Sequence, residues 1–366
     1  MHRRPVRYLC CLVTALYLYS VFPCQSLAIG TSATSAILMD ADSGRVLYEQ
    51  NADTRMLIAS TTKILTALIA IEEGTLSDPV TVSRNAAGTE GSAMYLQAGE
   101  QLTLETLLYG LMLCSGNDAA VAVAEHISGN CESFAARMNA RAAELGMENS
   151  SFANPNGLDD KKHYSTAQDM ARLACAAMEN ETLVRIASTQ SITIGGRTMS
   201  NHNKLLRTQD GCLGLKTGYT RAAGRTLVSC AEKNGQRLVA VTLQDGNDWA
   251  DHQALYEYGF SQFPTCTCAR KGQAVRWEEI TGGTVRRIPL LAAETVTWPL
   301  NNSETIQTTI HLTRPLMAPL TAGEVVGEAV FTVGDREVGR TPLLSGADVL
   351  PRLNLAIQTL KTGLPG

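Results

Sequence analysis

The segment Ser60–Glu73 constrains the fold of this chain more than any other segment. A helix over these residues is apolar on nearly all of its faces, and Gly74 closes it. The apolar residues are Ile64, Leu65, Leu68, Ile69 and Ile71. A helix that is apolar on most faces is buried at the centre of a domain. Lys63 is therefore a charge in a buried helix, which is costly unless that charge has a function.

Strands and helices are predicted on both sides of this helix. The hydrophobic spacing alternates in strands near the N-terminus, turns helical between residues 104 and 178, and alternates again up to residue 243. The predicted strands are Ser35–Met39, Arg45–Glu49, Ser191–Ile194, Arg225–Ala231 and Arg237–Leu243, and the predicted helices are Leu104–Leu113, Asp118–Ile127, Ser133–Leu145, Ser165–Met178 and Asp251–Phe263. Strands at both ends with helices between them indicate one sheet assembled from distant segments, plus an all-helical lobe. We expect an α/β domain over residues 29–263.

The character of the chain changes after Phe263. Thr, Val, Gly and Pro alternate, and segments such as Glu304–Thr313 and Val325–Val333 are typical of strands separated by turns. We therefore expect a small all-β domain over residues 264–343. Residues 344–366 then form an amphipathic tail with apolar residues at helical intervals, Val349, Leu350, Leu353, Ala356, Ile357 and Leu360. This tail is either a terminal helix packed on its own domain or an anchor at a membrane surface.

The N-terminus has the pattern of a secretory signal peptide. Arg3, Arg4 and Arg7 precede an apolar run over Tyr8–Phe22, and small residues follow at Ser26 and Ala28. The run is shorter than the ~20 apolar residues that a membrane span needs. We expect cleavage after Ala28 and an extracytoplasmic protein that begins at Ile29.

Charge and cysteine usage exclude several classes of protein. The formal net charge is -4 and no Lys/Arg run is present, so a nucleic-acid partner is not expected. Loss of Cys10, Cys11 and Cys24 with the signal peptide leaves seven of the ten cysteines, an odd number that cannot all pair internally. Cys266-Thr267-Cys268 lacks neighbouring His or Cys residues for zinc. We predict no disulfide framework, no metal and no cofactor.

The first motif with chemical meaning is Ser60-Thr61-Thr62-Lys63, at the start of the buried helix. Residues i and i+3 share a helix face, so Lys63 lies one turn above Ser60. A serine hydroxyl is a poor nucleophile until a base removes its proton, and a lysine can do so when burial or nearby positive charge lowers its pKa. The alternative for the motif alone is a lysine that reaches the helix surface.

Two further motifs follow along the chain. Ser115-Gly116-Asn117 lies in the break between two predicted helices, where a hydroxyl and an amide can relay a proton and hold a substrate amide. Taken alone, it is also an ordinary turn between helices.

The third motif, Lys216-Thr217-Gly218, leads into Tyr219 and a strand. On an extended chain, Lys216 and Gly218 share a face. A positive charge and a hydroxyl suit a carboxylate, and the missing side chain of Gly218 lets a substrate backbone lie against the strand.

The three motifs in this order resemble those of class A β-lactamases and penicillin-binding proteins. The chain is similar to the low-molecular-mass penicillin-binding proteins, the serine-type D-alanyl-D-alanine carboxypeptidases of peptidase family S11. The similarity extends to Asn154–Leu158 and His163–Ala167, and to Ala318-Pro319-Leu320 in the β-rich part. It covers about residues 33 to 343. It implies a β-lactamase/transpeptidase-like domain, with an antiparallel sheet and an all-helical lobe, followed by a small all-β domain.

The resemblance also implies roles for the site residues. Ser60 attacks the penultimate D-alanine of a peptidoglycan stem peptide ending in D-Ala-D-Ala, Lys63 takes the proton, and Ser115 relays it to the leaving D-alanine. Asn117, Lys216, Thr217, Gly218 and Tyr219 form the substrate-binding set. Within it, Asn117 bonds the substrate amide, Thr217 holds the terminal carboxylate, and Tyr219 donates its backbone N–H to the oxyanion hole. β-Lactam antibiotics are expected as covalent inhibitors, and the outer face of the cytoplasmic membrane as the location.

One departure from the family pattern concerns the substrate carboxylate. An arginine is expected after the strand that follows Lys-Thr-Gly, but Asp245–Asp251 contains none. Arg221 and Arg225 are the candidates to replace it.

The alternative functions are a class A-like β-lactamase, a D,D-endopeptidase or transpeptidase, and a wall-binding protein without catalysis. A β-lactamase needs a glutamate that activates the deacylating water, and the nearest acidic segment, Glu179–Leu183, follows a predicted helix and lacks the Glu-x-x-Leu-Asn pattern.

Overall fold

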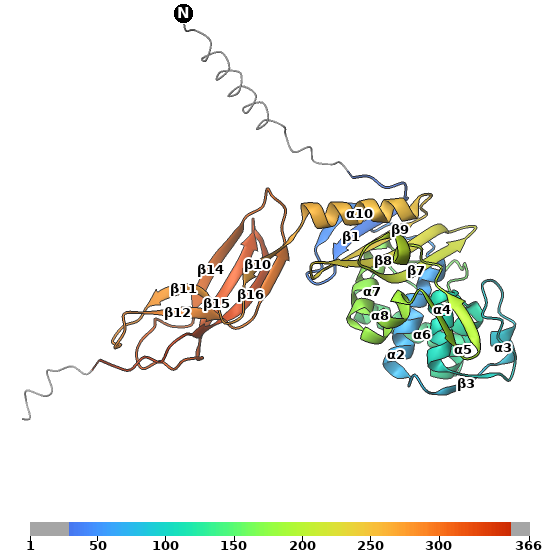
Figure 1. Ribbon diagram of the computed structural model, residues 1–366, viewed down its shortest axis with the longest axis horizontal. Coiled ribbons are helices and arrows are strands. Elements are labelled where there is room, and N and C mark those ends of the chain that lie inside the picture. The colour runs from blue at the N-terminus through green and yellow to red at the C-terminus, as the bar shows by residue number, and fades with distance from the viewer. Residues whose placement is uncertain (1–28, 353–366) are drawn as a thin grey trace, which may run out of the picture. The chain divides into compact units, whose positions relative to one another are not determined.

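The computed structural model of the protein describes residues 29–352 (Figure 1). The predicted signal peptide, 1–28, and residues 353–366 of the predicted tail lie outside the described residues. Within the described part of the chain, no helix is both long and apolar enough to cross a membrane.

A five-stranded antiparallel sheet joins the two ends of the α/β part. Its order is β2-β1-β9-β8-β7, so the first strand of the described chain pairs with a strand some 200 residues later. The strands are β1 (Ser35–Asp40), β2 (Val46–Gln50), β7 (Cys212–Thr220), β8 (Gly224–Lys233) and β9 (Gln236–Leu243). All six residues of β1 are buried, because helices cover both faces of the sheet. The predicted assembly of one sheet from distant segments is confirmed.

The helices form two layers around this sheet. In Figure 1, α10 lies along one face, where it contacts β1, β8 and β9, and α7 contacts the same strands from the helical lobe. The helices are α2 (Lys63–Glu73), α3 (Arg84–Ala87), α4 (Leu104–Leu113), α5 (Asn117–Ser128), α6 (Cys131–Glu144), α7 (Ala167–Glu179), α8 (Glu181–Ser188), α9 (Leu205–Thr208) and α10 (Asp248–Gln262). Two small two-stranded sheets accompany them: β3 (Pro79–Thr81) pairs with β4 (Gln101–Thr103), and the hairpin strand β5 (Ser191–Ile194) pairs with β6 (Arg197–Ser200).

Helix α2 is the buried central helix that the sequence predicts. It packs against α4, α5, α6 and α7, and its residues from Lys63 to Ala70 are all buried. Its start differs from the prediction, because Ala59–Thr62 form a separate 3-10 turn, η1, before the α-helix begins at Lys63. The helix predicted from Ser165 likewise begins at Ala167, since the Thr166 side chain caps it by accepting the N–H of Asp169. The predicted strand Ser191–Ile194 forms a separate hairpin and does not join the main sheet.

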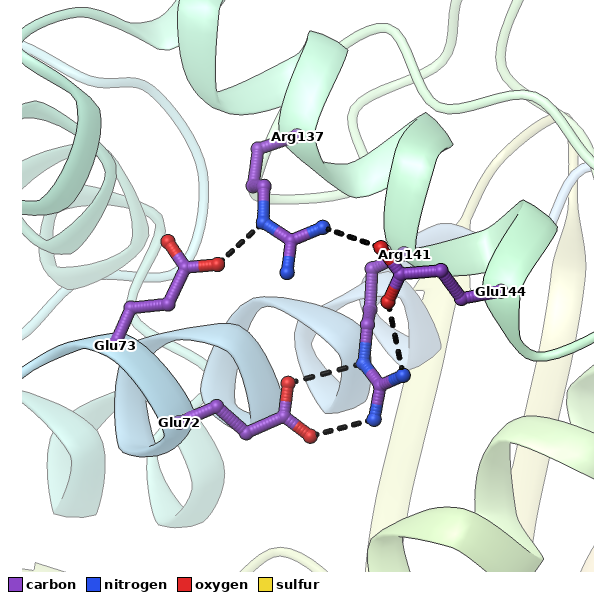
Figure 2. A network of polar contacts seen from close by, with 5 residues as sticks. All are labelled: Glu72, Glu73, Arg137, Arg141 and Glu144. Atoms are coloured by element: carbon purple, nitrogen blue, oxygen red, sulfur yellow. Dashed lines mark hydrogen bonds and ion pairs between the residues drawn. The ribbon is translucent and has the colours of Figure 1, made fainter.

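The exposed end of α2 is tied to α6 by ion pairs (Figure 2). Arg141 donates two hydrogen bonds to the Glu72 carboxylate, and Arg137 contacts Glu73. Glu144 bridges both arginines. Because these side chains are exposed or partly exposed, the pairs contribute little to the free energy of unfolding. The network therefore orients α6 on α2, while the buried apolar faces supply most of the stability.

The β-rich part has its own sheet and its own hydrophobic core. The sheet order is β11-β12-β16-β15-β14, and every pair is antiparallel. The strands are β10 (Thr265–Ala269), β11 (Ala274–Glu279), β12 (Arg287–Ala292), β13 (Val296–Pro299), β14 (Ile306–Leu312), β15 (Val325–Val333) and β16 (Arg336–Ser345), with β10 and β13 paired separately. Ile288, Leu290, Ala329, Phe331 and Leu343 are wholly buried in its core. The predicted fold class is confirmed for both parts.

The β-rich part extends past the predicted boundary at residue 343. Strand β16 runs to Ser345, and Val349 is buried in the same core, where its backbone pairs with Leu320. The predicted amphipathic stripe therefore cannot begin at Val349, because this side chain packs in the hydrophobic core of the β-rich part. Leu350, the next residue of the stripe, is exposed. The remaining members of the stripe lie outside the described residues.

Candidate active site

Ser60 and Lys63 meet at the junction of η1 and α2. Lys63 Nζ lies 2.9 Å from Ser60 Oγ, as the i and i+3 spacing predicts. The tight turn is closed by side chains, because the Thr61 and Thr62 hydroxyls donate to the carbonyls of Ile58 and Ala59. The motif thus places a hydroxyl and an amine in hydrogen-bonding contact at the start of a buried helix.

The Lys63 amine is buried and has two further partners. Nζ donates to Asn117 Oδ1 at 2.7 Å and to the backbone carbonyl of Asn156 at 2.6 Å. The pKa of Lys63 lies well below its usual range, mainly because the amine is buried and secondarily because Lys216 is near; Asp118 opposes the shift. A neutral amine has two N–H donors and one lone pair. Asn117 and Asn156 take the two donors, so the lone pair is directed to the Ser60 hydroxyl.

Asn156 belongs to a segment that is packed on the start of α2. The Pro155 carbonyl accepts the Thr66 hydroxyl at 2.7 Å, and His163 Nε2 lies 2.7 Å from Thr62 Oγ1. A Cβ on Gly157 would lie 1.9 Å from the carbonyl oxygen of Ala59, so this position requires glycine. The role of the Asn156 carbonyl could not be predicted from the sequence, because a backbone oxygen does not depend on residue identity.

Ser115 lies in the break between α4 and α5, as predicted. Its φ is +61°, a left-handed conformation that is uncommon for a residue other than glycine and that recurs at functional sites. Asn117, at the start of α5, donates its side-chain N–H to the Glu90 carbonyl at 2.7 Å. Both amide atoms of Asn117 are therefore bonded to protein, one of them to Lys63. A substrate amide must share or displace these contacts.

Asp118 is a positioning residue that the sequence did not indicate. Its carboxylate accepts the backbone N–H groups of Met94 and Leu96, at 2.9 and 3.1 Å. The pairing holds residues 92–96 beside the second motif, and Ser92 lines the cleft in front of it. The position of Asp118 directly after Ser-Gly-Asn is the signal from which the sequence could have predicted a role for it.

Lys216 lies on β7, the edge strand of the sheet, and is buried. Its Nζ donates to the carbonyl of Thr217 at 2.8 Å. Burial lowers the pKa of Lys216 to about 7, and the Cys114 thiol opposes this shift. Lys216 therefore loses much of its charge near neutral pH.

The packing of β7 against its neighbours requires glycine at position 218. A Cβ at this position would lie 2.4 Å from Thr226 Oγ1 and 2.9 Å from the backbone nitrogen of Ser60. The sequence interpretation, that the missing side chain leaves room for substrate backbone, is incomplete, because the glycine first allows β7 to approach η1. This approach brings the third motif to the first.

A cleft of about 500 Å³ opens over these elements. Of the predicted residues, Ser60, Ser115, Thr217, Gly218 and Tyr219 line it, whereas Lys63, Asn117 and Lys216 lie buried outside its lining. The other lining residues are Ser92, His202, Arg225, Asp248 and Trp249. Glu179 and Glu181, weighed for a β-lactamase, lie at the α7–α8 junction and do not line the cleft. Among the described residues, no group of three His, Cys, Asp or Glu side chains is placed to hold a metal ion.

Comparison with known proteins agrees with this geometry. The family model described as D-alanyl-D-alanine carboxypeptidase matches residues 24–247. The chain belongs to this family. A second model, the C-terminal domain of penicillin-binding protein 5, matches residues 263–350, which agrees with the extension of the β-rich part past residue 343. The resemblance expected from the three motifs is confirmed for the D-alanyl-D-alanine carboxypeptidase family as a whole.

Individual relatives cover most of the chain. The D-alanyl-D-alanine carboxypeptidase DacF of Bacillus subtilis is 33% identical over 87% of this chain and 86% of its own length. DacC of Escherichia coli, another D-alanyl-D-alanine carboxypeptidase, is 33% identical over 87% of this chain and 84% of its own. The crystal structure of penicillin-binding protein 5 from Haemophilus influenzae superposes with a TM-score of 0.71 at 30% identity, covering 88% of this chain and 98% of that one.

The lowered pKa of Lys216 predicts how stability depends on pH. Lys216 binds a proton with a pKa of about 7 in the folded state and near its ordinary 10.5 in the unfolded chain, so unfolding takes up a proton between these values. The free energy of unfolding should therefore rise with pH, by about 1 kcal/mol per pH unit between pH 7.5 and 8.5 from this lysine. Lys216→Met should make the slope shallower by that amount.

The matched control is Lys204→Met, which removes an exposed lysine. Urea unfolding at pH 7.5 and 8.5 gives the slope for each variant. Equal slopes in the wild type and in Lys216→Met would mean that Lys216 keeps its ordinary pKa in the folded protein.

Proposed function

We propose that this protein is a serine D-Ala-D-Ala carboxypeptidase, which removes the terminal D-alanine from peptidoglycan pentapeptides through an acyl-enzyme on Ser60. The observation that carries the proposal is the contact between the buried, easily neutralised Lys63 amine and the Ser60 hydroxyl at the cleft. Membership of the D-alanyl-D-alanine carboxypeptidase family supplies the substrate class. Relatives in that family carry this activity in their names.

Acylation begins when Lys63 Nζ accepts the proton of Ser60. Oγ then bonds to the carbonyl carbon of the penultimate D-alanine, and the carbonyl oxygen becomes an oxyanion. The backbone N–H groups of Ser60 and Tyr219 bind this oxyanion, and each such donor contributes about 3 kcal/mol. Ser115, which lines the same cleft, passes the proton to the amide nitrogen as the C–N bond breaks and free D-alanine leaves.

Deacylation uses the same groups in reverse roles. Water enters the space that D-alanine vacates, Lys63 accepts one of its protons, and the hydroxide attacks the ester carbonyl. The ester C–O bond breaks and Ser60 recovers its proton. Asn117 holds the acyl amide, Lys216 provides positive charge nearby while it is protonated, and Thr217 binds the substrate carboxylate. No glutamate is needed, which agrees with the position of Glu179 and Glu181 outside the cleft.

The cellular setting is part of the proposal. Residues 1–28 act as a signal peptide, and the mature protein works on peptidoglycan at the outer face of the cytoplasmic membrane. The tail after Arg352 contacts that membrane through its apolar stripe. We propose domain limits at residues 29–263 for the catalytic part and 264–352 for the β-rich part, the second of which follows from the burial of Val349.

Penicillin should form a long-lived adduct on Ser60. The leaving group of penicillin stays tethered to the acyl-enzyme and blocks the water that would hydrolyse it, whereas D-alanine departs. Intact mass should show one adduct in the wild type and none in Ser60→Ala. The acyl-enzyme from a D-Ala-D-Ala peptide should be hydrolysed at least 100-fold faster than the penicilloyl-enzyme.

This experiment also tests the alternatives. Rapid turnover of penicillin without release of D-alanine from peptides would support a β-lactamase. Product analysis on a defined pentapeptide, with and without an acceptor amine or a cross-linked dimer, separates hydrolysis from transpeptidation and from endopeptidase activity.

The pH dependence of acylation should report on Lys63. Because burial and Lys216 lower the pKa of Lys63, its neutral form accumulates at a pH well below the ordinary pKa of 10.5. The rate of acylation by penicillin should rise with pH through the lowered value and then level off. Stopped-flow labelling between pH 5 and 10 measures it, and Lys63→Met should show no such rise. A rate that still climbs at pH 10 contradicts the assignment of Lys63 as the base.

The tail should control membrane binding without affecting catalysis. A chain truncated after Arg352 keeps every described residue, so its activity on a soluble pentapeptide should equal that of the mature protein. Its sedimentation with anionic lipid vesicles should fall at least tenfold. Unchanged sedimentation would show that the tail is no anchor.

A further inference from the structure

The substrate of the proposed reaction ends in a carboxylate, and a cation is needed to bind it. The arginine expected between Asp245 and Asp251 is absent from the sequence. Lys216 is a poor substitute because it is buried, engaged with the Thr217 carbonyl and has a pKa of about 7. Among the residues that line the cleft, Arg225 is the only arginine or lysine.

Arg225 lies on β8, directly opposite Tyr219 of β7. This pairing belongs to the register that also joins Gly218 to Thr226 and Thr217 to Leu227. Directly paired residues in an antiparallel sheet project on the same side, so Arg225 and Tyr219 are neighbours at the end of the third motif. The Arg225 side chain is 44% exposed, so a ligand in the cleft can reach it.

Two residues at the start of α10 hold the Arg225 guanidinium. Asp248 accepts hydrogen bonds from Nε, at 3.1 Å, and from Nη2. The ring of Trp249 lies beneath the guanidinium carbon, with 5.6 Å to its centroid, a cation–π distance. Asp248 is itself nearly buried and accepts the N–H of Trp249 at 2.9 Å. Within residues 29–352, Nη1 of Arg225 makes no hydrogen bond, so this nitrogen remains for a ligand.

A second cation lies near the Trp249 ring. Lys204 Nζ lies 6.0 Å from the centroid of the same Trp249 ring. Arg225 and Lys204 thus place two cations at the Trp249 ring, beside the carboxylates of Asp248 and of Asp245, which acts on Asp248 electrostatically. A carboxylate entering beside Trp249 meets a guanidinium whose orientation is already fixed, which reduces the entropic cost of binding.

Arg221, the other candidate from the sequence, does not occupy this position. It lies between β7 and β8, is exposed, and does not line the cleft. Arg221 and Arg225 are therefore a matched pair, since the two arginines lie four residues apart and only one faces the site.

We propose that Arg225, oriented by Asp248 and Trp249, binds the C-terminal carboxylate of the leaving D-alanine and replaces the arginine that this chain lacks. The inference rests on the proposed carboxypeptidase function and adds its specificity-determining residue. Arg225 acts on binding and orientation of the free acid, while Ser60 and Lys63 carry the bond changes. The enzyme should therefore prefer a free C-terminal carboxylate to a C-terminal amide, and this preference should depend on Arg225.

The test compares two peptides that differ only at the C-terminus, one ending in D-Ala-D-Ala and the other in D-Ala-D-Ala amide. In the full mature chain, Arg225→Met should lower kcat/KM about 100-fold for the acid. The rate on the amide should change less than threefold, which also shows that the variant is folded. Arg221→Met should keep the wild-type values for both peptides.

Two further variants define the mechanism. Asp248→Asn leaves Arg225 in place but weakens its orientation, so it should lower the preference for the acid about tenfold. If Arg225→Met loses both activities, Arg225→Ala with added guanidinium chloride distinguishes loss of carboxylate binding from loss of folding. A guanidinium in the vacated space should restore hydrolysis of the acid more than that of the amide.

An Arg225→Met enzyme that keeps the wild-type preference for the acid would overturn this inference and leave the carboxypeptidase function intact. The same conclusion follows if guanidinium chloride restores neither activity or both equally. If the wild type itself releases neither D-alanine from the acid nor D-alanine amide from the amide, the proposed function fails instead.

Discussion

The burial of one lysine organises the catalytic part of this protein. Lys63 lies in the most apolar helix of the chain, where an amine without partners is strongly unfavourable. Its three contacts, to Ser60, Asn117 and the Asn156 carbonyl, come from three separate segments. Each of these segments is positioned by packing on α2 or α5. The same burial that makes the lysine costly also lowers its pKa, so stability and the chemistry of the site have one cause.

The sheet determines where the third motif meets the first. Strand β1 pairs with β9, and β8 then places β7 at the edge beside η1. The approach is so close that only glycine fits at position 218, between Thr226 and the Ser60 backbone. Lys216 is buried by the same approach. The two lysines of the site thus lie near each other, and the charge of Lys216 disfavours the charged form of Lys63.

A buried hydrogen-bond network joins α10 to the sheet. Ser229 on β8 lies 2.6 Å from both His252 Nδ1 and Tyr256 Oη, and Thr242 lies 3.1 Å from His252 Nε2. Burial lowers the pKa of His252 to about 3, so the ring is neutral at physiological pH and its two nitrogens match one donor and one acceptor. This network fixes α10 on the sheet. The start of α10 carries Asp248 and Trp249, so a buried polar cluster outside the site positions the residues that hold Arg225.

The sequence alone determined the features that depend on local spacing and composition. It predicted the buried helix, the Ser60–Lys63 contact, the strand carrying Lys216, the family and the change to an all-β part after residue 263, because periodicity and motif order are local properties of a chain. Tertiary structure decided the rest. The Asn156 carbonyl is a backbone atom without sequence identity, and Val349 joins the β core through a pairing with Leu320 that no local pattern shows. The choice of Arg225 over Arg221 depends on strand register and on the start of α10, since residues brought together across a sheet are distant in sequence.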